Sequence, residues 1–192
     1  MKLRGLYAIT PEPLDLPKLE RALEGRPALL QYRRKRRDSA EAREVVALAR
    51  RYNVPVIVND DVELALEVDA AGAHLGRDDG DLPAARRRLA GKILGASCYN
   101  DAALARSVVR AGADYVAFGS VFPSPTKPAA VRAPLSLFSL DLGVPRAAIG
   151  GITLQNARSV VDAGADLLAV ITDLFDAPDI AQRAAQYREL FA

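Results

Sequence analysis

The sequence has little of several residue types, and each shortage excludes a class of protein. Its 192 residues include one cysteine, one histidine and no tryptophan. A single cysteine, Cys98, cannot form an internal disulfide or a multi-cysteine metal site, so we expect a reducing compartment, the cytoplasm. The longest apolar stretches are shorter than the roughly 20 residues of a membrane helix, and the first residues lack the apolar segment and cleavage site of a secretory signal. We therefore expect no membrane span and no export.

The charge is nearly balanced, with 26 basic and 24 acidic side chains and a net charge of +2. A general nucleic-acid binder carries a large basic excess, so this balance excludes that class. Half of the residues are hydrophobic, which excludes wholesale disorder and favours one domain over residues 1–192. The positive charge is nevertheless concentrated in one place, because residues 33–37 are five cations in succession.

Short apolar runs alternate with stretches of helical spacing along the whole chain. The runs are rich in β-branched and aromatic residues, which is typical of parallel strands buried on both faces. Eight such runs in 192 residues leave about 24 residues for each strand–helix unit, which favours an α/β fold, a single (β/α)8 TIM barrel, over an open doubly wound sheet. The expected strands are residues 6–10, 28–33, 56–59, 73–76, 93–97, 115–119, 147–150 and 167–171.

Helical spacing predicts helices over residues 39–52, 100–111 and 155–163. Ser39 is the expected N-cap of the first of these helices. Between residues 129 and 143 only a short element is expected. No Gly-x-Gly-x-x-Gly segment opens a helix, which weakens a dinucleotide site.

The second expected strand ends in a polar and basic segment, Gln31 to Lys35. In a barrel of this kind the site forms at the C-terminal ends of the strands. Alternation places Gln31, Arg33 and Lys35 toward the mouth, where an amide and two cations suit an anion such as phosphate. The remaining arginines of the segment, Arg34, Arg36 and Arg37, are interpreted as solvated charge.

Pairs of aspartates follow the next two strands, Asp60 with Asp61 and Asp78 with Asp79. Capping of a helix N-terminus accounts for one aspartate in each loop but poorly for two. Mg²⁺ would relieve the repulsion between the loops, because it binds one or two carboxylates together with phosphate oxygens and waters. We therefore expect a Mg²⁺ site here, with N-capping as the alternative.

The later loops add hydroxyl groups, a lysine and a glycine pair. Ser97 ends the fifth strand, where it could bind a ligand or cap a helix, and the loop after the sixth strand places Lys127 among prolines that restrict the backbone. Gly151 and Thr172 follow the seventh and eighth strands, the common place of a barrel phosphate site. Two anion-binding sets in one mouth indicate a transfer between two phosphorylated ligands, with diphosphate as the leaving group. The one histidine, His74, is interpreted as structural.

Taken together, these segments resemble the thiamine phosphate synthase family over nearly the whole chain. The matching segments occur in family order: LYAIT at 6–10, QYRRK at 31–35, VNDDV at 58–62, HLGRDD at 74–79, FPSPTK at 122–127 and IGGI at 149–152. The resemblance implies a (β/α)8 barrel. It also implies a transferase that couples 4-amino-2-methyl-5-(diphosphooxymethyl)pyrimidine to a thiazole ethyl phosphate, giving thiamine phosphate and diphosphate.

The resemblance further implies roles for individual residues. Mg²⁺ would be held by Asp60 and Asp79. Catalytic stabilisation of the departing diphosphate would come from Arg33, Lys35, Ser97 and Lys127. The pyrimidine diphosphate would contact Gln31, Tyr32, Arg33, Arg34, Lys35, Asn59, Ser97 and Lys127. The thiazole phosphate would contact Ser124, Pro125, Thr126, Gly151, Ile171 and Thr172.

Four positions depart from the usual family pattern: Arg77 stands for Gln, Tyr99 for His, Ser124 for Thr and Thr172 for Ser. Arg77 would add a cation that could compete with the metal. Two other functions stay open, a thiazole tautomerase of the same barrel family and a non-catalytic sensor of phosphorylated ligands. The tautomerase pattern lacks the Asn59-Asp60 pair and the lysine loop. A homodimer is also considered, although no residue locates an interface.

Overall fold

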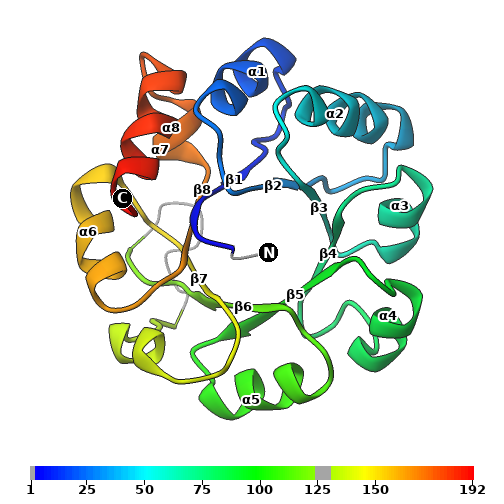
Figure 1. Cartoon of the computed structure of the whole chain (residues 1–192), viewed down its shortest axis with the longest axis vertical. Helices are drawn as coiled ribbons and strands as arrows, with labels where there is room; N and C mark the ends of the chain where they lie inside the picture. The colour runs from blue at the N-terminus through cyan, green and yellow to red at the C-terminus, as the bar shows by residue number, and fades with distance from the viewer. Residues whose placement is uncertain (1–2, 124–130) are drawn as a thin grey trace.

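The computed structural model describes residues 3–123 and 131–192, and its centre is a closed barrel of eight parallel strands. Each strand pairs with the next along the chain, and β8 pairs with β1. Helices surround this ring on the outside (Figure 1). The predicted (β/α)8 TIM barrel is therefore confirmed. The strands are β1 (Gly5–Ile9), β2 (Leu29–Tyr32), β3 (Val56–Asn59), β4 (Gly72–Leu75), β5 (Ile93–Tyr99), β6 (Tyr115–Gly119), β7 (Arg146–Ile149) and β8 (Leu167–Val170).

The helices follow the strands with short loops, as the spacing of the sequence requires. They are α1 (Leu16–Glu24), α2 (Ser39–Arg51), α3 (Val62–Glu67), α4 (Leu82–Arg88), α5 (Ala102–Arg110), α6 (Leu154–Asp162), α7 (Thr172–Phe175) and α8 (Ile180–Glu189). The short element expected between residues 129 and 143 is a 3₁₀ helix, η1 (Leu135–Ser139). In the described part of the chain, no helix is both long and apolar enough to cross a membrane.

Alternation along the strands divides the core into two layers. Inward-facing side chains fill the barrel itself, among them Tyr7, Leu29, Ile57, Tyr115 and Leu167. Outward-facing side chains pack under the helices in a larger second layer. The inner layer closes the barrel below its mouth, so a ligand site can form only at the strand ends and the loops that follow them.

Aspartates cap the start of six of the described helices. The capping residues are Asp15, Asp38, Asp61, Asp81, Asp101 and Asp179, and each carboxylate accepts a hydrogen bond from a backbone N–H of the first turn. The prediction of Ser39 as the cap of α2 is wrong, because Asp38 holds that position. A carboxylate suits it well, since it both accepts the bond and favours the positive end of the helix dipole.

Candidate active site

The ends of β2, β3 and β4 surround a cavity of about 490 Å³ at the mouth of the barrel. Its lining includes Lys35, Asn59, Asp60 and Asp79. These four predicted residues therefore come together from three different loops, whereas Gln31, Arg33 and Ser97 do not line this cavity. In the β3 loop the N-cap is Asp61, so capping does not account for Asp60. In the β4 loop the N-cap is Asp81, so capping does not account for Asp79.

The local backbone places Asp79 close enough to Asp60 to raise the pKa of the Asp60 carboxyl group. Asp60 has φ +63°, a left-handed conformation that aspartate tolerates better than most residues. Its N–H donates to the carbonyl oxygen of His74 at 2.8 Å, which ties the ends of β3 and β4 together. Asp79 accepts a bond from the Gly76 N–H at 2.8 Å, and a side chain on Gly76 would put Cβ only 2.7 Å from that carboxylate.

The electrostatics of this pair are unfavourable without a cation. Partial desolvation, and then the neighbouring Asp79 carboxylate, raise the pKa of Asp60 to about 6, while the positive charge of Arg33 acts in the opposite direction. The described residues contain no group of three or more His, Cys, Asp or Glu side chains placed to hold a metal. Two carboxylates that leave further positions to phosphate oxygens and water fit Mg²⁺, which keeps several such ligands.

The two faces of the Gln31 to Lys35 segment differ as alternation predicts. Arg33 and Lys35 are exposed at the mouth. Tyr32 packs against the helix layer, and its hydroxyl donates to Glu41 at 2.8 Å. Arg34 also pairs with Glu41, at 2.6 Å, with its side chain only 8% exposed, so the interpretation of Arg34 as solvated charge is wrong.

Tyr32 and Arg34 both line the cavity, although their known contacts are structural. The Arg34 guanidinium stacks over the Tyr32 ring at 5.1 Å. Its Nη2 is buried without a hydrogen-bond partner in the described part of the chain.

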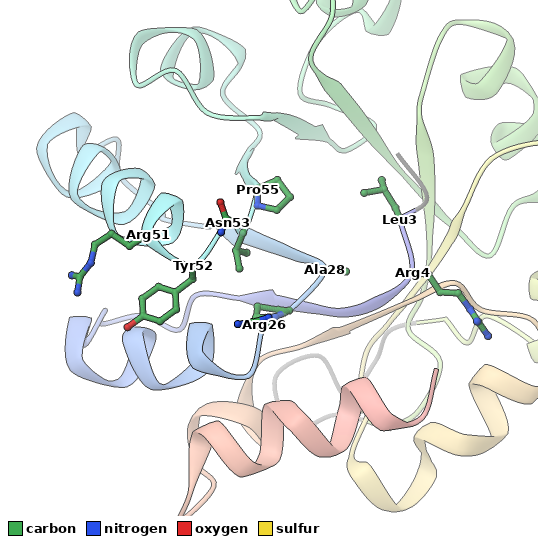
Figure 2. A pocket seen from close by; sticks show the side chains of 10 residues that line it. Leu3, Arg4, Arg26, Ala28, Arg51, Tyr52, Asn53 and Pro55 are labelled. Carbon is green, nitrogen blue, oxygen red and sulfur yellow. The ribbon is translucent and has the colours of Figure 1, made fainter. Parts of the chain in front are cut away.

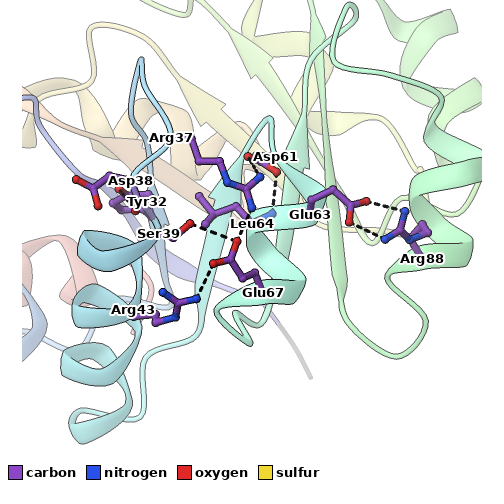
Figure 3. A network of polar contacts seen from close by, with 10 residues as sticks. All are labelled: Tyr32, Arg37, Asp38, Ser39, Arg43, Asp61, Glu63, Leu64, Glu67 and Arg88. Carbon is purple, nitrogen blue, oxygen red and sulfur yellow. Dashed lines mark hydrogen bonds and ion pairs between the residues drawn. The ribbon is translucent and has the colours of Figure 1, made fainter.

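Arg37 is exposed, as predicted, and it is also paired. Its guanidinium donates to Asp61 at 2.8 Å and to Glu67 at 2.5 Å, and Arg43 reaches the same Glu67 (Figure 3). These contacts join the start of α2 to α3. The five successive cations therefore differ in their contacts. Arg33 and Lys35 are exposed at the mouth, and Arg36 is exposed as well. Arg34 and Arg37 form ion pairs that hold the loop in place.

Arg77 is exposed and contacts an aromatic side chain. Its guanidinium lies over the ring of Tyr99, 5.0 Å from the centroid, and the Arg77 N–H donates to the Tyr99 hydroxyl at 3.3 Å. The two departures from the family pattern, Arg77 and Tyr99, thus contact each other. Stacking on an aromatic face favours the cation and gives it a partner other than the carboxylates.

The other half of the predicted site is only partly described. Ser124, Pro125, Thr126 and Lys127 lie outside the described residues. Thr172 is exposed as the first residue of α7, and Ile171 precedes it as the N-cap. Gly151 has φ +64°, and a Cβ there would lie 2.4 Å from the Pro123 carbonyl oxygen. The backbone of the β6 loop therefore already requires glycine at this position, and the predicted phosphate contact of Gly151 stays a prediction.

A hydrogen-bonded chain across the barrel interior went unrecognised in the sequence. Gln31 Nε2 donates to the Tyr7 hydroxyl at 2.9 Å, and the hydroxyls of Tyr7 and Tyr115 are 2.7 Å apart. The Tyr115 hydroxyl lies 2.9 Å from His74 Nδ1, and His74 Nε2 lies 2.9 Å from Ser97 Oγ. The feature of the sequence that could have indicated these hydrogen bonds is the presence of polar side chains at inward positions of otherwise apolar strands.

A second cavity, of about 500 Å³, lies at the opposite, N-terminal end of the barrel. Figure 2 shows Arg26, Arg51 and Tyr52 at its wall, beside the end of α2. Arg51 pairs with Glu20 at 3.2 Å, and Arg4, also at this wall, donates to the Phe191 carbonyl oxygen. No residue predicted for the site lies here, which agrees with the rule that barrel sites form at the other end.

A closed (β/α)8 barrel with two aspartates and exposed cations at the C-terminal ends of its strands has the architecture of the barrel enzymes, whose sites form at this end. Residues 6–174 match the sequence profile described as thiamine monophosphate synthase. The chain belongs to this family, as its motifs predicted.

Relatives with this name match the chain over its full length. The thiamine-phosphate synthase of Aromatoleum aromaticum is 61% identical over 202 aligned residues, covering 99% of this chain and 97% of the relative. The thiamine-phosphate synthase of Azoarcus sp. is 53% identical, and the alignment covers 100% of this chain and 98% of the relative. Among solved structures, thiamine phosphate pyrophosphorylase from Pyrococcus furiosus has a TM-score of 0.86 at 32% identity, covering 99% and 96%. A 3-hexulose-6-phosphate synthase from Salmonella typhimurium, at 18% identity and TM-score 0.79, shares the fold.

Proposed function

We propose that this barrel couples the pyrimidine methyl diphosphate to a thiazole ethyl phosphate with the help of Mg²⁺ held at its mouth. The coupling activity itself is that of the full-length relatives called thiamine-phosphate synthase, at 61% and 53% identity, so the chain is a transferase of this type and its substrates are phosphorylated small molecules. The observation that supports the metal is the meeting of the Asp60 and Asp79 carboxyl groups in the cavity at the ends of β3 and β4.

Asp60 and Asp79 would hold the ion, which would supply positive charge to the diphosphate oxygens when bound. Asp79 has one carboxylate oxygen engaged by the Gly76 N–H, which fixes its orientation. Asn59 donates to the Asp60 carboxylate and so orients the second ligand. Such supporting contacts set the direction in which a ligand carboxylate points.

The protein's own part in the reaction is to stabilise the leaving group and to align two substrates. The bond between the exocyclic methylene carbon and the diphosphate oxygen breaks, and the thiazole nitrogen lone pair forms the new carbon–nitrogen bond. That nitrogen carries no proton, so no general base is needed. Arg33 and Lys35, exposed at the mouth, together with Ser97 and Lys127, would neutralise the negative charge that grows on the diphosphate. One preorganised donor of this kind is typically worth about 10²–10³ in rate.

The substrate contacts divide between the two sides of the mouth. Gln31, Tyr32, Arg34 and Asn59 would complete the pyrimidine diphosphate side, where the buried Nη2 of Arg34 has no hydrogen-bond partner among the described residues. The thiazole phosphate side would consist of Ser124, Pro125, Thr126, Gly151, Ile171 and Thr172. The exposed hydroxyl of Thr172 at the start of α7 supports this second assignment.

The test is synthesis by the purified chain, with thiamine phosphate detected as its fluorescent oxidation product. We expect product from the two substrates with Mg²⁺, loss of product with excess chelator, and loss of turnover in Asp60→Ala and Lys127→Ala. Asp162→Ala, at the exposed end of α6 away from the mouth, is the matched control and should keep full activity. Undiminished synthesis in chelator, or full activity of both site variants, would refute the metal and leaving-group roles.

The same assay separates the alternatives. A tautomerase would change the thiazole phosphate without coupling it, and a sensor would bind both ligands without product. The adjacent Asn59 and Asp60 at the cavity favour the synthase over the tautomerase pattern.

Three further expectations accompany the proposal. Cys98 is a buried free thiol, which suits the reducing cytoplasm. The nearly balanced charge supports the absence of a nucleic-acid partner. A homodimer is tested by sedimentation velocity, where a species of about twice 20.6 kDa is the expected result.

A further inference from the structure

The hydrogen-bonded chain beneath the mouth runs from Gln31 to Ser97, and both end residues are proposed to contact the diphosphate substrate. We propose that this chain fixes the direction of the hydrogen bonds so that Ser97 presents its O–H as a donor to an anionic ligand, with His74 and Tyr115 as positioning residues. The inference deepens the proposed function, because it assigns how the serine hydroxyl is oriented for the diphosphate. The five residues come from β1, β2, β4, β5 and β6.

The direction of the chain follows from the number of hydrogens that each group carries. The Gln31 amide nitrogen is a donor only, so the Tyr7 oxygen accepts from it and passes its own hydrogen to Tyr115. Tyr115 then donates to Nδ1 of His74, which must be unprotonated. The ring proton is therefore on Nε2, which donates to Ser97 Oγ.

The direction of these hydrogen bonds determines whether Ser97 attracts or repels an anionic ligand. When His74 donates to Ser97, the serine hydrogen is free to point toward an anion. In the opposite direction Ser97 would donate to His74 and would present only lone pairs to the same anion. A diphosphate in the mouth would be attracted in the first case and repelled in the second.

The surroundings of the hydrogen-bonded chain favour one fixed direction of its hydrogen bonds. Tyr7, Tyr115 and His74 are exposed by 1%, 0% and 5%, and polar groups buried in this way form networks that favour one arrangement. Gly95 makes room for them, since a Cβ at that position would lie 2.1 Å from a Tyr115 ring carbon and 2.5 Å from His74 Nδ1.

The first test reads the position of that proton directly. His74 is the one histidine in the chain, so ¹⁵N labelling of histidine gives signals from a single ring. We expect Nε2 to be of the protonated type and Nδ1 of the unprotonated type in the ligand-free protein at pH 7. A proton on Nδ1 would overturn the proposal. This measurement needs no activity, so it decides the direction of the chain even if the coupling reaction were not observed.

The second test asks whether Tyr115 acts through Ser97. Tyr115→Phe should lower kcat/KM by about 5- to 10-fold, the effect of roughly one hydrogen bond, and by less than about 2-fold when Ser97→Ala is already present. An equal loss in both backgrounds would show a merely structural role and refute the relay. Tyr52→Phe is the matched control, because its hydroxyl bonds to Glu20 at the far end of the barrel, and it should leave kcat/KM unchanged.

A pair of substitutions at His74 gives an independent check. The amide nitrogen of His74→Gln can take the place of Nε2, whereas that of His74→Asn takes the place of Nδ1. We expect His74→Gln to keep several-fold more kcat/KM than His74→Asn at equal thermal stability. Equal activities in two equally stable variants would contradict the proposal.

Discussion

At the scale of single residues, the mouth contains one carboxyl group whose environment opposes its charge. Desolvation and the nearby Asp79 raise the pKa of Asp60 from its usual range to about 6. Because the folded state binds this proton more tightly than the unfolded state, the contribution of Asp60 to stability is lost as the pH rises from about 4 through 6. A charged group that lowers the stability of the folded state in this way is typical of functional sites.

This argument predicts the behaviour of Asp60→Asn in metal-free protein. Asparagine keeps the left-handed backbone and removes the charge, so the melting temperature at pH 7.5 should rise by about 1–3 °C, a modest shift because solvent screens this exposed site. The gain should vanish below about pH 4, where the wild-type carboxyl is protonated. Thermal unfolding over a pH series measures both effects, and a lower melting temperature at pH 7.5 would contradict the argument.

His74 has the opposite dependence on pH. Burial lowers the pKa of its ring to about 4, so the unfolded state binds the proton more readily between pH 6.5 and 4. Stability should fall as the pH decreases through this window. Compared with His74→Gln, which cannot titrate, the wild type should lose on the order of 2–3 kcal/mol between pH 7 and pH 4 in denaturant unfolding. A constant difference between the two proteins would mean that the ring is not held neutral.

At the scale of elements, the sequence predicted the strands to within two residues, because continuous apolar runs with β-branched residues mark buried parallel strands. The caps were less predictable. Ser39 and Asp38 are adjacent, both are good capping residues, and only the backbone conformation decides between them. In the β4 loop the same ambiguity spans Asp78, Asp79 and Asp81, and the last of these holds the cap.

The caps predict a specific loss of stability. The Asp101 carboxylate accepts bonds from the N–H groups of Ala103 and Leu104 at the start of α5. Asp101→Ala should therefore cost about 1 kcal/mol, or 2–4 °C in melting temperature for a domain of this size. Asp101→Asn, which keeps an acceptor, should lose less than half of that amount. Equal losses in the two variants would assign the effect to charge rather than to capping.

At the scale of the whole molecule, closing the ring determines which loops share the mouth. Strand order was predictable, so the sequence could place Arg33, Lys35, Asp60 and Asp79 at one end. It could not pair Tyr7 with Tyr115, 108 residues away, because alternation gives the side on which a residue lies and not its partner across the barrel. The same limit hid the stacking of Arg77 on Tyr99 and the pairing of Arg34 with Glu41.

The shared mouth also predicts how ligands stabilise the barrel. A metal held by only two carboxylates and a diphosphate held by exposed cations should each bind weakly alone, because each supplies ligands or charge that the other needs. Mg²⁺ or diphosphate alone should raise the melting temperature by less than about 2 °C. At about 100 times the joint dissociation constant, the two together should raise it by about 5–10 °C.

The matched variants make this prediction specific to the carboxylate pair. In Asp60→Asn the joint shift should fall to the sum of the two single shifts, while Asp162→Ala, whose side chain is far from the mouth, should retain it. Differential scanning fluorimetry over a grid of both concentrations gives all of these values. Additive shifts in the wild type would mean that metal and diphosphate bind independently, and the carboxylates of β3 and β4 would then not share a ligand with the cations of β2.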